Sequence, residues 1–317
     1  MKIAPSKNCL QELFFYDFLL KNKIMYDIMN STKSRRTTVV YKTKLCLGTS
    51  EQFAITIEEQ IKLFKESGFE GFFTMWDKHL KKYRKLADEL ELIFQSVHAP
   101  FENAAKMWGN DGEAKHAVEE LVCCVKDCAE VNVPILVVHP YIGFEEKANP
   151  TYDGVENFRI VVEEAKRCNV KIAFENVEGE EYLRILMDTF KIYENVGFCW
   201  DSGHELCYNK GRDMLSLYGD RLIATHINDN LGVSDFDGSI FWTDDLHLLP
   251  FDGITDWKKA VKRLNRHGYN DILTFELNKM SKPNRHENDK YTNMTVEEYI
   301  SECYIRACKV AYMKNGI

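Results

Sequence analysis

The sequence lacks an apolar run long enough to cross a membrane. The most apolar early stretch, residues 10–20 (LQELFFYDFLL), contains Glu12 and Asp17 and is far shorter than the roughly 20 apolar residues that a spanning helix needs. It also lacks the basic start and the small-residue cleavage site of a secretory signal. We therefore expect a protein without a membrane segment that resides in the cytoplasm.

The sequence also lacks paired cysteines and an excess of basic residues. Its ten cysteines include no CxxC pair and lie scattered in apolar contexts, as is typical of reduced, buried thiols in a cytosolic protein. The net charge of -8 argues against a broadly basic nucleic-acid-binding face, although a local basic patch stays compatible with it. These features favour a small-molecule substrate over nucleic acid, and they leave a homo-oligomer open.

From residue 44 onward, short apolar runs alternate with segments of helical spacing. Ile57, Ile61 and Phe64, for example, follow the first run at helical spacing, and Gly68 ends that helix. Such alternation predicts parallel strands joined by helices. The eight predicted strands lie within residues 44–50, 69–76, 92–99, 133–140, 170–176, 196–202, 221–227 and 271–277.

Eight such units predict an α/β fold, namely a single-domain (β/α)8 TIM barrel over residues 44–317. An open doubly wound sheet is the alternative, but it normally has a glycine-rich phosphate-binding turn after its first strand, where this chain has only Gly48. Residues 1–43 differ in composition, with an aromatic-rich amphipathic segment followed by a basic one. We expect them to form an N-terminal extension outside the barrel that contributes no ligand.

Residues that bind metals recur where the predicted strands end. Glu175, Asp201, His226 and Glu276 follow four different strands, and parallel strands of a barrel present their carboxyl ends at one face. Carboxylate and imidazole groups suit a hard or borderline divalent ion and would leave positions for a substrate. The two glutamates could move a proton to and from a carbon beside a metal-polarised carbonyl.

Further residues of this kind are expected to line the same cavity. Each alone is more often a hydrogen-bonded or solvated residue than a ligand, and only their joint position suggests additional metal or substrate contacts. These residues are His98, His139, His204, Asp245 and His247. Three tryptophans, at positions 108, 242 and 257, could line a sugar pocket, but we expect them to serve packing, as large aromatic residues usually do.

The motifs around these residues resemble one known superfamily. They are HAPF at His98, HPY at His139, ENVEG at Glu175, CWDSGHE at Asp201, HINDN at His226, DLHLLPFDGITDW at His247 and FELN at Glu276. Together, over roughly residues 44–310, they resemble the xylose isomerase-like TIM barrels. That superfamily includes sugar phosphate isomerases and epimerases, ketose 3-epimerases, inosose dehydratases and the endonuclease IV enzymes.

The resemblance implies a divalent metal (Mn²⁺, Mg²⁺, Co²⁺ or Zn²⁺) held by Glu175, Asp201, His226 and Glu276. It also implies that the two glutamates form an acid/base pair and that His204 contacts the substrate. On this basis we favour a metal-dependent isomerase or epimerase of a sugar, sugar phosphate or inosose.

The alternative is a zinc-dependent AP endonuclease (AP endonuclease family 2). The nine candidate residues together resemble the set by which endonuclease IV holds three zinc ions. Against this, Gly203 stands where the endonuclease pattern has Cys, and residues 231–247 carry extra acidic and aromatic side chains. A barrel that binds a sugar or nucleic acid without turnover is a third class. Both acid/base candidates, Glu175 and Glu276, are present, which disfavours that class.

Overall fold

The computed structural model describes residues 43–144, 149–235 and 239–316. The predicted extension, residues 1–43, lies outside these ranges apart from Thr43, which is buried.

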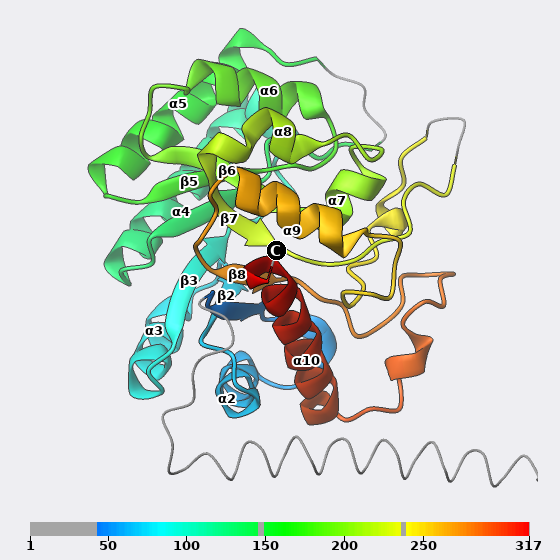
Figure 1. Cartoon of the computed structure of the whole chain (residues 1–317). Coiled ribbons are helices and arrows are strands. Elements are labelled where there is room, and N and C mark those ends of the chain that lie inside the picture. Colours follow the sequence, from blue (N-terminus) through cyan, green and yellow to red (C-terminus); the bar gives the residue numbers. More distant parts are fainter. Residues whose placement is uncertain (1–42, 145–148, 236–238, 317) are drawn as a thin grey trace, which may run out of the picture. The chain divides into compact units, whose positions relative to one another are not determined.

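Eight parallel strands form one nearly closed sheet (Figure 1). Each pairs with its neighbours in chain order, and Ile227 pairs with Phe275 to bring the last two strands together. The predicted (β/α)8 TIM barrel is therefore confirmed. The strands are β1 (Leu45–Gly48), β2 (Gly71–Met75), β3 (Ile93–His98), β4 (Ile135–Val138), β5 (Lys171–Glu175), β6 (Val196–Asp201), β7 (Leu222–His226) and β8 (Leu273–Phe275).

Helices follow the strands as the alternation predicts. Thr56 and Glu59 form a capping box at the start of the first, and Gly68 ends it at φ 108°, a conformation that favours glycine. The expected helices are α2 (Ile57–Ser67), α3 (Leu80–Glu89), α4 (Gly112–Glu130), α5 (Tyr152–Arg167), α6 (Glu180–Thr189), α8 (Met214–Tyr218) and α9 (Trp257–Arg266). Two more, α7 (Ser202–Cys207) and α10 (Val296–Asn315), were not predicted.

The strand ends place the candidate residues at one end of the barrel. Glu175, Asp201, His226 and His98 are the last residues of their strands, and Asp201 pairs with His226 in register. Residues 139 and 276 directly follow β4 and β8. Below this end, Val137, Ala173 and Cys199, which have no exposed surface, belong to a buried apolar cluster. Among the described residues, every helix is too short or too polar to cross a bilayer.

Candidate metal centre

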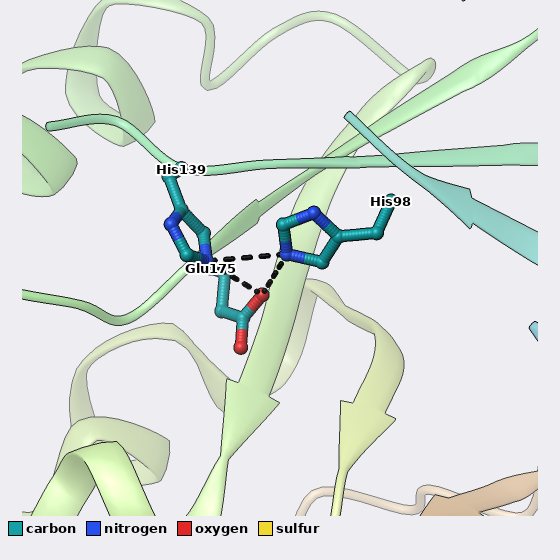
Figure 2. Close-up of side chains that lie close together, drawn as sticks. All are labelled: His98, His139 and Glu175. Atoms are coloured by element: carbon teal, nitrogen blue, oxygen red, sulfur yellow. Dashed lines mark hydrogen bonds and ion pairs between the residues drawn. The ribbon is translucent and has the colours of Figure 1, made fainter. Parts of the chain in front are cut away.

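Glu175 lies at the centre of the site. Its side chain is completely buried, and one carboxylate oxygen, Oε2, lies 3.3 Å from His98 Nε2 and 3.4 Å from His139 Nε2 (Figure 2). The other oxygen, Oε1, lies 3.1 Å from His226 Nδ1. One carboxylate thus faces histidines from three other strands.

His98, His139 and Glu175 form a first group whose dimensions fit a metal ion. The two histidine Nε2 atoms stand 3.2 Å apart, so the three atoms make a nearly equilateral triangle with the 3.3 and 3.4 Å separations to Glu175. Around a tetrahedral zinc with bonds of about 2.0–2.1 Å, the ligand atoms are separated by about 3.3 Å. Two histidines and a glutamate are also a known catalytic zinc set.

A second group contains the four residues predicted as the principal ligands. One atom from each of Glu175, Asp201, His226 and Glu276 lies within 4.8 Å of the others. His226 Nδ1 is 2.9 Å from Glu276 Oε2. The structure therefore brings these four strand ends together, and their role as ligands stays a prediction.

A third group lies beside the second and shares Asp201 with it. Ligand atoms of Asp201, His204 and His247 lie within 4.8 Å of one another. Asp245 joins them, because its Oδ1 is 2.7 Å from His247 Nε2 and 3.3 Å from His204 Nε2. All nine residues singled out from the sequence therefore lie in one cluster.

Two carboxylate oxygens in these groups point to a cation between the side chains. Glu175 Oε2 and Asp245 Oδ1 are buried and make no hydrogen bond, although each lies within 3.4 Å of two histidine nitrogens. Buried polar atoms without a partner are rare and need an explanation, such as an ion. The residues present therefore fit divalent metals.

Several histidines are oriented by a hydrogen bond at their second ring nitrogen. His98 Nδ1 lies 2.7 Å from the Ala99 carbonyl oxygen, and His204 Nδ1 lies 3.0 Å from that of Asn176. The carbonyl accepts a hydrogen bond from Nδ1–H, and in a neutral imidazole this leaves Nε2 with the lone pair that binds a metal. In both residues, Nε2 is the atom that faces a carboxylate of the site.

Two asparagines that sequence reasoning did not assign hold Asp201 in place. Asn228 Nδ2 donates to Asp201 Oδ2 at 2.8 Å, and Asn176 Oδ1 accepts from the Asp201 backbone at 2.8 Å. Both are fully buried. Asn176 directly follows the predicted ligand Glu175 in the ENVEG motif, and Asn228 lies two residues after His226 in HINDN. This closeness to predicted ligands is the one sequence signal that could have identified them.

Gly203 is required by this arrangement. A Cβ at this position would overlap the amide oxygen of Asn228, so the approach of Asn228 to Asp201 depends on glycine. The departure from the endonuclease pattern at residue 203 is thus coupled to the way this chain holds Asp201.

Burial shifts the pKa of His139 in the direction that favours metal binding. Burial lowers the pKa of His139 to about 4, so this imidazole is neutral near pH 7, which is the form that binds metals. Burial raises the pKa of Asp201 to about 6, against the opposing charge of His204. Carboxylates crowded without water favour a cation among them.

The chain belongs to the xylose isomerase-like TIM barrel family, because the model of that family matches residues 57–294. An uncharacterised protein of Sinorhizobium fredii, y4fM, is 29% identical over 265 residues, which cover 69% of this chain and 80% of that protein. A probable endonuclease 4 of Mycoplasma capricolum is 26% identical over 160 residues, 42% of this chain and 52% of that protein.

Solved structures show the same fold. The IolI protein with a bound zinc atom superposes with a TM-score of 0.68 at 18% identity, covering 85% of this chain and 98% of that one. D-Psicose 3-epimerase with D-tagatose, from Clostridium cellulolyticum H10, gives 0.63 at 14% identity, covering 85% and 99%. At these sequence identities, the structural similarity establishes the fold alone, so the activity must be inferred from the residues of the site.

Proposed function

We propose that this chain is a multinuclear metal-dependent enzyme that hydrolyses a phosphate ester, with a small phosphorylated carbohydrate as substrate. The observation that carries this proposal is the union of three ligand groups through shared carboxylates: Glu175 belongs to the first and second, and Asp201 to the second and third. An epimerase of the one-metal type needs the second group alone.

Burying the polar side chains outside the second group costs free energy that only a function would explain. Three of them, His98, His204 and His247, are no more than 6% exposed. Burying polar side chains in one cavity costs free energy unless they are paired or bind a metal. A second and a third ion would give these side chains partners.

Shared carboxylates favour phosphoryl chemistry. Groups that share a ligand hold their ions close together, as in enzymes that clamp both the attacking and the leaving oxygen of a phosphate ester. When bound, such ions would neutralise the phosphate and lower the pKa of water. Glu175 and Asp201 would set the spacing of the ions, while the Ala99 and Asn176 carbonyls keep His98 and His204 in the binding tautomer.

The nature of the ligands favours zinc among the candidate metals. The first group offers two imidazoles and one carboxylate, which suit Zn²⁺ better than Mg²⁺. The zinc in the related IolI structure supports this choice. The net charge of -8 favours a small phosphate ester over duplex DNA, which attracts basic surfaces.

A sugar isomerase or epimerase is the second candidate, and the second group favours it. Glu175 and Glu276 both belong to that group, as an acid/base pair would require. However, the Glu175 side chain has no exposed surface and its two oxygens face four histidines, which leaves little room for a substrate proton. Glu276, with 27% of its side chain exposed, is the more accessible of the two.

Hydrolysis and proton exchange separate the two candidates. We expect the zinc-loaded protein to release phosphate from sugar phosphates, and the His139→Ala variant to lose this activity. An epimerase would instead incorporate deuterium from D₂O beside the carbonyl of its sugar and lose that exchange in Glu276→Gln. Deuterium incorporation without phosphate release, in a protein that tolerates His139→Ala, would overturn the proposal.

A further inference from the structure

An exposed tryptophan stands on a firmly held turn at the mouth of the site. Trp242 begins the 3-10 turn η5 (Trp242–Asp244), in the connection between β7 and α9, and 49% of its surface is exposed. The expectation that this tryptophan serves packing is therefore wrong, whereas Trp108 and Trp257, each 4% exposed, do pack. A large exposed aromatic residue beside a cluster of candidate ligands suggests a binding contact.

The turn is anchored by Asp244, which is completely buried. Its carboxylate accepts from the Ser234 backbone and hydroxyl at 3.0 Å and from Arg285 Nη1 at 2.8 Å, and its carbonyl accepts from Asn230 Nδ2 at 2.8 Å. The Arg285 contact ties the β7 connection to the segment after β8. Trp242 is thus exposed although its backbone is held, so ordering it for a ligand would cost little entropy.

Lys282, from the segment after β8, lies over this tryptophan. Its Nζ is 5.5 Å from the centre of the Trp242 ring and 3.8 Å from Asp245 Oδ2. The other oxygen of Asp245 faces the histidines of the third ligand group. The Trp242–Lys282 pair therefore borders the metal centre directly.

The pairing of Lys282 is weak compared with that of its neighbour. Arg285 is held by both Asp244 and Glu287 at 2.8 Å, whereas the Lys282 contact to Asp245 is close to the limit for an ion pair. A divalent ion held by Asp245 would compete for that carboxylate and release Lys282. An ammonium group at the mouth of a metal site is suited to an anionic oxygen.

We propose that Trp242 and Lys282 form a substrate subsite that takes a ring-bearing phosphate ester. Trp242 stacks against the face of the sugar ring, and Lys282 pairs with a phosphate oxygen. The position of the phosphate rests on the proposed function, whereas the stacking contact does not. The ligand class is a small sugar phosphate, because one ring and one cation make up the subsite.

Equilibrium binding to the zinc-loaded protein tests this subsite. The probes are the phosphonate analogue of ribose 5-phosphate, which resists hydrolysis, together with ribose and inorganic phosphate. We expect Lys282→Ala to weaken binding of the phosphonate and of phosphate by about tenfold and to leave ribose unchanged. Trp242→Ala should weaken binding of the phosphonate and of ribose by about five- to tenfold and leave phosphate unchanged.

Matched controls separate a local contact from a general effect. Lys262→Ala removes a charge from the exposed face of α9, and Tyr152→Ala removes a 77%-exposed aromatic ring at the start of α5. Both should bind all probes as the wild type does. Zinc content and thermal midpoint should be unchanged in all four variants, so a binding loss cannot be attributed to unfolding or metal loss.

Three outcomes would overturn the subsite: no binding of the phosphonate by the wild type, equal binding by wild type and both variants, or tighter Lys282-dependent binding of an abasic duplex. The proposed function can fail separately. One zinc per chain combined with Lys282-dependent phosphonate binding would refute the multinuclear centre and keep the subsite. Three zincs per chain, with phosphonate binding unchanged in Lys282→Ala and Trp242→Ala, would support the multinuclear centre and refute the subsite.

Discussion

At the scale of single residues, the site depends on Glu175, whose two oxygens serve two ligand groups. Glu175→Gln keeps the shape and removes the charge. We expect the variant to lose the ions of the first and second groups, because an amide is a poor metal ligand and cannot balance two cations. Metal analysis of the purified variant should find at most one zinc per chain.

Glu181→Gln, an exposed glutamate on α6, is the matched control and should keep the wild-type metal content. A full zinc complement in Glu175→Gln would contradict the assignment of Glu175 as the shared ligand.

Gly203 gives a second test at this scale. Gly203→Ala places a Cβ against Asn228, which must then release Asp201. We expect a loss of about 1–3 kcal/mol in the free energy of unfolding, measured by denaturant titration, and weaker metal binding. Gly112→Ala, in a helix with no atom near the added Cβ, should be neutral or slightly stabilising. Equal stability of the two variants would rule out the steric argument.

At the scale of elements, the strands and most helices could be predicted, whereas the loops that carry part of the site could not. The apolar runs ended in Glu175, Asp201 and His226, and the carboxyl-end rule for parallel strands then placed these residues together. The position of η5 depends on side-chain hydrogen bonds of Asp244, among them the bond from Arg285, which lies far away in the sequence. Periodicity carries no signal for such contacts, and the exposure of Trp242 was missed for that reason.

A second buried carboxylate holds the later part of the connection between β7 and α9. Asp229, completely buried after β7, accepts from the backbones of Phe251 and Thr255 and from Trp257 Nε1 at 2.9–3.0 Å. Its backbone also pairs with Leu248, next to His247. This residue therefore fixes the loop that carries part of the third ligand group.

Asp229→Ala should lower the free energy of unfolding by about 3 kcal/mol, because several buried donors lose a charged acceptor. Thermal melting and denaturant titration measure this loss. Asp188→Ala, an exposed aspartate on α6, should melt as the wild type does. If Asp229→Ala melts at the same temperature as Asp188→Ala, the loop is held by other contacts.

At the scale of the whole molecule, the barrel brings together nine residues from six strand ends or their connections, and residues 43–316 contain all of them. A protein that begins at Thr43 should therefore fold and bind metal as the full chain does. Circular dichroism melting and metal analysis of this shortened protein test the expectation. Failure to fold would show that residues 1–42 belong to the core.

If the three ligand groups bind three ions, native mass spectrometry can count these ions on the intact protein. We expect the wild type to titrate to three zincs per chain and His139→Ala to two, because this histidine belongs to the first group alone. His116→Ala, on the outer face of α4, should keep three. A wild type that saturates at one zinc, with His139→Ala unchanged, would show that the first and third groups bind no metal.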